Sequence, residues 1–363
     1  MKPEADGSRT PEPPRRSRRK TKDRRALIIA LSLVAVLGLG GIVAVWAVQQ
    51  RLVGNVESLG DPFDAIPTRP PAAAPAPGAE GVTNGAVPLN LLVVGSDSRI
   101  SAGDPSQWKA GAQRTDAIML IHLPADRRGA YAMSIPRDSW VDVPGRGKAK
   151  INAAFSYGGP SLLIQTVEQL TNVRIDHFAV TDFESFQAIT DQLGGVQITL
   201  KKDLYSGSRL VLPAGEHLMS GDQALAYVRD RKSLARGDFD RVQRQQAWMR
   251  AIFARMRNEQ TLQNPVKSVP FLDAVSKSIA ADDGLTRDVM TDLVDRAKGL
   301  GSSDIAFFTV PIAGTGRSAD GQSIVNLAQP AFDELMAAVA ADDVATYLEA
   351  NPDDVDLLPP VAS

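Results

Sequence analysis

Residues Ala26–Val48 form a run of 23 uncharged, mostly apolar residues. At about 1.5 Å per residue, a helix of this length spans about 35 Å, which exceeds a bilayer core of about 30 Å. A secretory signal has an apolar region of only about 7–15 residues, and Val45-Trp46-Ala47 is a poor cleavage site. The sequence therefore predicts one retained transmembrane helix over residues 26–48.

The segment before this run, residues 1–25, is strongly basic. It holds ten Lys or Arg and four Asp or Glu, and eight of the basic residues lie between Arg15 and Arg25. Positive charge beside a span favours the cytoplasmic side, and a segment with so few apolar residues cannot offset its ordering entropy. We expect a disordered cytoplasmic tail and a single-pass protein of the cell membrane with an extracytoplasmic main domain.

The exported part of the chain is acidic and lacks cysteine. Without the tail it has 30 basic and 38 acidic residues, a net charge of −8, which argues against nucleic acid as its partner. The lack of cysteine excludes disulfides, zinc–thiolate sites and cysteine nucleophiles. With only three histidines, histidine-based metal clusters and catalytic triads have little support. Stability must come from a packed core.

Residues 49–86 are rich in Pro and Ala and are predicted to form an extended stalk. The composition then changes to near-continuous apolar runs of strand length, which are typical of a sheet covered on both faces. These runs are Leu89–Val94, Ala117–Leu123 and Ala130–Ile135. Strands and segments of helical period alternate along the rest of the chain, and the last predicted helix covers Ser323–Ala340.

This alternation predicts an α/β fold, a three-layer α/β/α domain over residues 87–345. The last residues, 346–363, are expected to form a loose tail.

The segment YVRDRKSLARGDFDRVQRQQ, residues 227–246, concentrates guanidinium groups. Arg229 and Arg231 share a side only in an extended segment, whereas Arg241 and Gln245 share one face of a helix. Guanidinium groups on a short stretch of backbone are suited to gripping two adjacent phosphates. A solvated charged face is the alternative.

Two carboxylates lie at the ends of predicted strands. Asp97 directly follows the first strand and Asp116 opens the second, with Arg99 and Arg114 each two residues away. Such carboxylates can hold a hard cation, and Mg²⁺ favours one or two carboxylates plus substrate phosphates. The alternative is that each Asp is a turn or cap residue.

Arg137, in SIPRD, follows the third predicted strand, and a surface ion pair with Asp138 is its alternative role. Lys150 precedes a predicted helix, where it could be a solvated loop residue. The candidates together match a magnesium–pyrophosphate site, in which the metal and arginines spread the charge of a transferring phosphoryl group. They are two Asp and one Arg from the ends of predicted strands and the Arg and Gln residues of the segment 227–246. The chain has neither a Walker loop nor a GxGxxG turn, so soluble nucleotides are not expected as ligands.

Six blocks occur in order along the chain: NLLVVGSDSR, RTD, SIPRD, KIN, AVTDFESFQAITDQLGGV and GDQALAYVRDR…GDFDRVQRQQ. With the single N-terminal anchor, this pattern resembles the LytR–CpsA–Psr family of bacterial cell-wall enzymes over residues 87–320. Family members transfer a phosphorylated glycan from a polyprenyl-pyrophosphate carrier to peptidoglycan. One departure is QWKAGAQ, which lengthens the loop between Asp97 and Asp116 and puts that loop's contacts in doubt.

The resemblance implies a mixed sheet between helices, an apolar lipid tunnel, and a phosphotransferase that depends on Mg²⁺ or Mn²⁺. It implies that Asp97 and Asp116 are metal-binding and catalytic, together with Arg137, Arg229 and Arg231. The implied pyrophosphate-binding set is Arg99, Arg114, Arg137, Arg229, Arg231, Arg241 and Gln245. Candidates for the tunnel lining, which could equally be core residues, are Phe155, Phe178, Phe183, Phe186, Ile189 and Leu193.

The expected partners are a polyprenyl-pyrophosphate-linked glycan, peptidoglycan and the cytoplasmic membrane. A composition rich in Ala, Asp and Arg hints at a GC-rich genome and hence at arabinogalactan attachment. Three alternatives remain: a hydrolase in which water replaces the acceptor, a DNA-binding regulator, and a non-catalytic lipid-binding protein. Residues 1–25 show no helix-turn-helix pattern, and basic residues beside a span are explained by topology. A lipid-binding protein would not need the full set of Arg and Asp.

Overall fold

The computed structural model describes residues 51–52, 54–73, 87–96, 115–230, 234, 236–301, 303–359 and 361–362, with only the backbone of residues 182–185. The chain divides into two compact units, residues 1–50 and 51–363, and all of the described residues belong to the second. The predicted basic tail and the span over residues 26–48 lie outside the described residues. Within the described part, no helix has the length and apolar character needed to cross a membrane.

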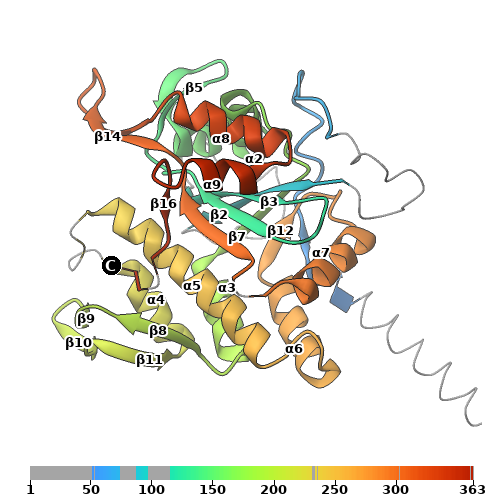
Figure 1. Cartoon of the computed structure of the whole chain (residues 1–363), viewed down its shortest axis with the longest axis vertical. Helices are drawn as coiled ribbons and strands as arrows, with labels where there is room; N and C mark the ends of the chain where they lie inside the picture. Colours follow the sequence, from blue (N-terminus) through green and yellow to red (C-terminus); the bar gives the residue numbers. More distant parts are fainter. Residues whose placement is uncertain are drawn as a thin grey trace, which may run out of the picture. The chain divides into compact units, whose positions relative to one another are not determined.

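A mixed sheet forms the centre of the second unit (Figure 1). Its strands are β1 (Glu57–Ser58), β2 (Leu89–Ser96), β3 (Thr115–Leu123), β4 (Ala130–Ser134), β7 (His177–Asp182), β12 (Ile279–Ala281), β13 (Ile305–Thr309) and β16 (Asp356–Leu357). Within the described residues the spatial order is β1-β12-β7-β2-β3-β4-β13-β16. β2 runs parallel to β7 and antiparallel to β3, and β4 runs antiparallel to β3 and parallel to β13. The predicted mixed sheet is confirmed.

Alternate residues of the central strands face two different helical layers. Leu92 and Val94 belong to the core shared with α2 (Ile151–Thr171) and α8 (Ala331–Ala340). Val93 and Met119 face the opposite layer, which contains α3 (Phe183–Gln192) and α5 (Asp238–Asn258). Burial on both faces explains the near-continuous apolar strands. The other described helices are α4 (Gly221–Arg229), α6 (Pro265–Ser276), α7 (Arg287–Gly299) and α9 (Val344–Ala350).

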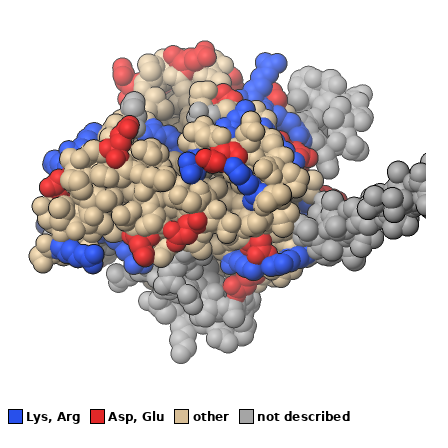
Figure 2. All heavy atoms as spheres, turned by 90° about the horizontal axis from the view of Figure 1, so that it is seen from below, with Lys and Arg blue, Asp and Glu red and all other residues tan. Residues whose placement is uncertain are grey.

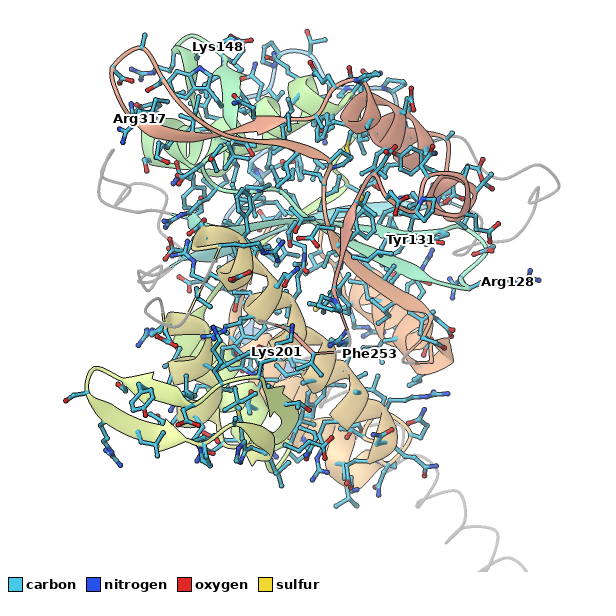
Figure 3. The ribbon with its side chains drawn as sticks, turned by 60° about the vertical axis from the view of Figure 1, so that its left-hand side comes forward. Arg128, Tyr131, Lys148, Lys201, Phe253 and Arg317 are labelled. Atoms are coloured by element: carbon cyan, nitrogen blue, oxygen red, sulfur yellow. The ribbon has the colours of Figure 1, made fainter. Side chains whose placement is uncertain are left out.

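Among the described residues, four two-stranded sheets lie outside the central sheet, and three of them are hairpins of consecutive strands. The four sheets are β5 (Trp140–Val143) with β6 (Gly147–Lys150), β8 (Val196–Leu200) with β11 (Gly215–Met219), β9 (Leu204–Ser206) with β10 (Arg209–Leu212), and β14 (Ile312–Arg317) with β15 (Ser323–Leu327). Lys148 and Arg317 lie on the same side of the molecule, at the outer ends of the first and last hairpins (Figure 3). A parallel bridge joins these two hairpins, between Ser139, just before β5, and Val325, in the middle of β15.

The helix predicted over Ser323–Ala340 is wrong in its first half. Residues 323–327 form β15, which pairs antiparallel with β14, and α8 begins only at Ala331. Pro330 immediately precedes the helix and disfavours helical geometry at the residue before it. The apolar spacing in the sequence continues across this proline, and the prediction therefore joined a strand and a helix into one helix.

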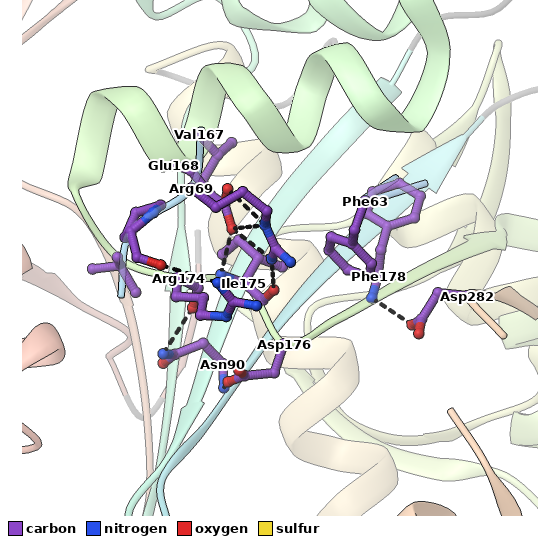
Figure 4. Close-up of polar contacts among 12 residues, drawn as sticks. Phe63, Arg69, Asn90, Val167, Glu168, Arg174, Ile175, Asp176, Phe178 and Asp282 are labelled. Atoms are coloured by element: carbon purple, nitrogen blue, oxygen red, sulfur yellow. Dashed lines mark hydrogen bonds and ion pairs between the residues drawn. The ribbon is translucent and has the colours of Figure 1, made fainter. Parts of the chain in front are cut away.

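Residues 57–70 differ from the extended stalk predicted over residues 49–86. β1 pairs with β12, and Leu59 and Ile66 are buried in the core that includes α2. Arg69 Nη2 donates to Glu168 Oε1 at 2.7 Å, and its guanidinium lies 4.3 Å from the centre of the Phe63 ring (Figure 4). A few apolar residues and one arginine thus attach a Pro-rich segment to α2, because each has a buried partner there.

The C-terminal residues also differ from the predicted loose tail. β16 pairs antiparallel with β13, and Val355 and Ala362 are 7% and 3% exposed. Asp356 accepts hydrogen bonds from the Gln243 side chain and forms an ion pair with Arg236 at 3.3 Å. The tail is therefore fastened to the sheet and to the first turns of α5.

Candidate functional site

The described candidate residues gather at one edge of the central sheet. β2 ends at Ser96, which pairs with Thr115 at the start of β3 and with Asp182 at the end of β7. Because β4 runs antiparallel to β3, it ends at this same edge and leads into Arg137. Strand pairing thereby brings Asp116 and Arg137 together although they are 21 residues apart in the chain.

Helix α5 supplies the remaining charges of the site. The helix begins after Gly237, whose φ of 58° lies in the left-handed region that glycine adopts without strain. Asp238 and Asp240 lie in its first turn, where negative charge suits the positive end of the helix dipole. The Arg241 side chain is only 5% exposed and meets both Asp238 and Asp116.

Asp116, Arg137, Asp238 and Arg241 form a compact group that we call the Asp–Arg cluster. Arg137 Nη1 donates to Asp116 Oδ1, and Arg241 Nη2 pairs with Asp238 Oδ1. Two longer contacts close the ring: Arg137 Nε lies 3.4 Å from Asp238 Oδ2, and Arg241 Nη2 lies 3.9 Å from Asp116 Oδ1. Two carboxylates and two guanidinium groups give the cluster a formal charge of zero.

The environment keeps Arg137 cationic. Burial would by itself lower the pKa of its guanidinium, but the charges of Asp238 and Asp116 outweigh burial, and the pKa is raised above its ordinary value. Arg137 is therefore a permanent cation that can change partners without losing its proton.

The alternative role for Arg137, an ion pair with Asp138, is not what fixes the loop that carries it. Asp138 Oδ1 instead lies 3.2 Å from Lys150 Nζ, so Lys150 is not merely a solvated loop residue. The Asn152 amide donates to the Arg137 carbonyl at 3.1 Å, which ties the loop to the first turn of α2. The Arg137 side chain is left to face the cluster.

An apolar cavity of about 60 Å³ lies between the sheet and helices α3 and α5, one turn along α5 from the cluster. Gln245, one helical turn after Arg241, lines it. Its Nε2 is buried without a hydrogen-bond partner among the described residues. The apolar lining includes Val93, Ala117, Met119, Phe186, Trp248 and Met249. One face of α5 therefore presents an arginine, Arg241, in one helical turn and borders the apolar cavity with Gln245 in the next.

Not every predicted phosphate ligand joins the cluster. Arg229 is the last residue of α4 and is exposed. The nearby Arg244 has a structural role, since its Nη1 donates to the Tyr227 carbonyl at 3.1 Å and holds the end of α4 against α5. Four candidates lie outside the described residues: Asp97, Arg99, Arg114 and Arg231.

The predicted tunnel residues separate into three groups. Phe186 lines the apolar cavity. Phe155 and Phe178 are fully buried on the opposite face of the sheet with ring centroids 6.4 Å apart, so for them the core alternative holds. Ile189 and Leu193 belong to a separate cluster with α6. The side chain of Phe183 lies outside the described part.

Sequence reasoning missed some residues that the structure brings to the site. No role was predicted for Asp238, although its spacing of three from Arg241 is that of a helical ion pair. Trp248 and Met249 follow Gln245 by three and four positions, which places them on its helix face. This spacing can be read from the sequence, but the strand residues that line the cavity opposite these side chains cannot.

Comparisons with known proteins place these observations in a family. A model described as the LytR_cpsA_psr family matches residues 74–341. The chain is 39% identical over 203 residues to the probable cell wall biosynthesis protein LcpB of Corynebacterium glutamicum, covering 54% of this chain and 48% of that protein. It is 31% identical over 289 residues to cell wall biosynthesis protein LcpA of the same species, covering 69% and 54%. The chain thus spans about half the length of the curated relatives it matches.

The fold has a match among solved structures. The structure of TagT bound to LI-WTA has 26% sequence identity and a TM-score of 0.57, covering 72% of this chain and 92% of that one. TagT is a protein of B. subtilis.

Proposed function

The chain belongs to the LytR–CpsA–Psr family, and on this premise we propose that it is a membrane-anchored phosphotransferase of cell-wall assembly. It moves a glycan phosphate from a polyprenyl-pyrophosphate carrier to peptidoglycan and releases polyprenyl phosphate. Attachment of arabinogalactan is the specific case that the composition favours.

One observation carries this proposal: the Asp–Arg cluster and the apolar cavity meet on a single face of α5. Arg241 belongs to the cluster, and Gln245, one turn later, lines the cavity. A ligand that occupies both must have a charged head beside an apolar chain. A polyprenyl pyrophosphate has this form, and TagT, which shares the fold, has been seen with LI-WTA.

In the proposed reaction, a peptidoglycan hydroxyl attacks the glycan-linked phosphorus. The new O–P bond forms as the bond from that phosphorus to the bridging oxygen breaks, and the electron pair leaves with polyprenyl phosphate. Arg137 and Arg241 hold the phosphate oxygens and stabilise the charge that develops on them. Gln245 orients the head group at the mouth of the cavity. The hydroxyl proton passes to a carboxylate, for which Asp116 and Asp97 are the candidates.

The metal requirement remains part of the proposal. The described residues contain no group of three or more His, Asp or Glu side chains that could hold an ion by themselves. Mg²⁺ needs only one or two carboxylates when phosphates and waters supply the remaining oxygens. Asp116, at the start of β3 with a side chain 15% exposed, could supply one such carboxylate, and Asp97, outside the described residues, is the proposed second. A bound Mg²⁺ or Mn²⁺ would neutralise charge on the pyrophosphate.

The apolar cavity is too small for a polyprenyl chain as it stands. Its volume of about 60 Å³ compares with about 300–1,000 Å³ for pockets that hold small ligands. A polyprenyl chain would therefore extend beyond this cavity. Phe186 and Trp248, whose ring centroids are 5.4 Å apart, are the large aromatic side chains of its lining.

Two alternative functions, a hydrolase and a nucleic-acid-binding regulator, place different demands on the molecule. A hydrolase would use the same residues with water as the acceptor. A nucleic-acid-binding regulator would need a basic surface, but the exported part carries −8, and on the face shown in Figure 2 Lys and Arg are interspersed with Asp and Glu. We retain the hydrolase as the second candidate.

A reconstituted reaction tests the proposal. The full chain, in detergent micelles, is given a polyprenyl-pyrophosphate-linked glycan, peptidoglycan fragments and Mg²⁺ or Mn²⁺. We expect glycan-phosphate to appear on peptidoglycan, with loss of transfer on chelation and in Asp116→Asn. Free glycan phosphate without transfer would favour the hydrolase. Undiminished transfer in excess chelator would remove the metal from the mechanism.

The location at the membrane is tested separately. A single span with its basic tail inside leaves residues after Gln49 outside the cytoplasm. Protease added to intact spheroplasts should cut the exported part and spare the tail. Cleavage of the tail with protection of the rest would reverse the proposed topology.

A further inference from the structure

Asp238 occupies both arginines of the Asp–Arg cluster at once. Its Oδ1 pairs with Arg241 Nη2, and its Oδ2 lies 3.4 Å from Arg137 Nε. A carboxylate is an anion with two oxygens, and guanidinium groups bind these oxygens as they bind two oxygens of a phosphate. The two side chains assigned to the pyrophosphate are therefore already engaged by an anion that belongs to the protein.

Asp238 is also the most exposed member of the cluster. Its side chain is 28% exposed, whereas those of Asp116 and Arg241 are 15% and 5% exposed. An incoming anion would thus meet Asp238 first, and the displaced carboxylate could rotate into water. Arg241 is too buried to move out with it.

The backbone beneath Asp238 is held independently of the cluster. Asp240, two residues later, is 1% exposed and accepts hydrogen bonds from the Arg236 amide at 2.9 Å and from Arg236 Nε at 2.8 Å. Arg236 is held in turn by Asp356 of the C-terminal tail, 3.3 Å away. The first turn of α5 is fixed by these contacts, so release of Asp238 requires only a change of its side-chain rotamer.

From this geometry we propose that Asp238 is a resident counter-anion that keeps Arg137 and Arg241 in place until a pyrophosphate displaces it. The inference rests on the proposed function, because it takes the cluster to be the pyrophosphate site. With Asp238 in place the cluster is neutral. With Asp238 turned out, the two guanidinium groups of the cluster keep one carboxylate of the cluster, Asp116, and can accept a dianionic phosphate. Asp238 thereby competes with the substrate and lowers its affinity, which favours turnover over tight binding.

The sign of the effect on affinity tests this assignment. Inorganic pyrophosphate is titrated calorimetrically, without divalent cation and at fixed salt, into the full chain in detergent micelles. Asp238→Asn and Asp238→Ala should each bind pyrophosphate about 5- to 10-fold more tightly than the wild type, because an ion pair no longer has to be broken. Asp295→Asn, which removes an exposed carboxylate paired with Lys298, is the matched charge control and should bind as the wild type does.

Each other outcome is decisive. Weaker binding in both Asp238 variants, with unchanged thermal unfolding, would show that Asp238 is a strut that the arginines need, and would overturn the proposal. Equal affinity in the wild type and both variants would also overturn it, while leaving the pyrophosphate site itself intact. Absence of binding in all four proteins would overturn the proposed function of the cluster and this inference with it.

Discussion

The Arg137 guanidinium donates to the Asp116 carboxylate, 21 residues earlier in the chain, although Asp138 is its immediate neighbour. Asp138 is engaged by Lys150, 3.2 Å away, and the loop backbone is held by α2. Arg137 is thus aimed across the sheet edge. Its proposed role in anion binding can therefore be tested separately from the position of the loop that carries it.

Replacing Arg137 by Ala should weaken binding of inorganic pyrophosphate by about 1.5–3 kcal/mol, as expected for a lost hydrogen bond to a charged group. Calorimetric titration of the full chain in detergent micelles measures this. Lys150→Ala is the matched control, because it changes the same loop without touching the cluster, and it should leave the affinity unchanged. An equal loss in both variants would mean that loop geometry, and not the Arg137 charge, controls binding.

Replacing Arg69 by Ala should lower the free energy of unfolding by about 3 kcal/mol, because it leaves a buried carboxylate without its cation. Glu168 is 2% exposed and accepts from both Nε and Nη2 of Arg69. Chemical denaturation of the full chain provides the measurement. In the control, Arg51→Ala, the lost pair with Asp273 involves an arginine 65% exposed, so the change should stay below about 1 kcal/mol. Similar small losses in both would show that residues 57–70 attach only weakly.

Filling the apolar cavity should separate lipid binding from head-group binding. Ala117 lines the cavity, and Ala117→Leu would occupy much of its volume of about 60 Å³. We expect less polyprenyl lipid to co-purify, by mass spectrometry, with pyrophosphate affinity unchanged because the Asp–Arg cluster is not altered. Ala337→Leu, on the exposed side of α8, is the control. Undiminished lipid in Ala117→Leu would place the lipid chain elsewhere.

Tyr227→Phe should alter stability mainly at high pH. The Tyr227 hydroxyl is buried without a partner among the described residues, and burial raises the pKa of this phenol from 10.0 to about 12. Since the folded state binds the proton more tightly, this contribution to stability is present below pH 10 and is lost as pH rises toward 12. The Phe variant should be equally or slightly more stable at neutral pH, by up to about 1 kcal/mol, because no hydrogen bond is removed.

Urea denaturation at several pH values between 9 and about 12 measures this difference. The variant should lose less stability than the wild type over that range. Tyr205→Phe changes an exposed tyrosine and should follow the wild-type curve. A Phe variant that is less stable at neutral pH would show that the hydroxyl has a stabilising contact.

The strands and helices that position the site could largely be predicted from periodicity. Near-continuous apolar runs predicted β2, β3 and β4, and the spacing of Arg241 and Gln245 predicted a shared face on α5. The predictions that differ from the structure concern segments whose state depends on distant partners. Residues 57–70 look like a linker by composition, but β12 and Glu168 supply the pairing and the charge that hold them.

The sequence by itself determined the membership of the family and the set of charged residues, because the order of motifs and the spacing of side chains on a helix are properties of the chain. Only the tertiary structure decided which charges meet. Antiparallel pairing of β3 with β4 sets Arg137 against Asp116, and packing of α5 on the sheet adds Asp238 and Arg241. Ion pairing acts over a few ångströms, and such distances between residues far apart in the chain are fixed by strand register and helix packing, which local sequence does not specify.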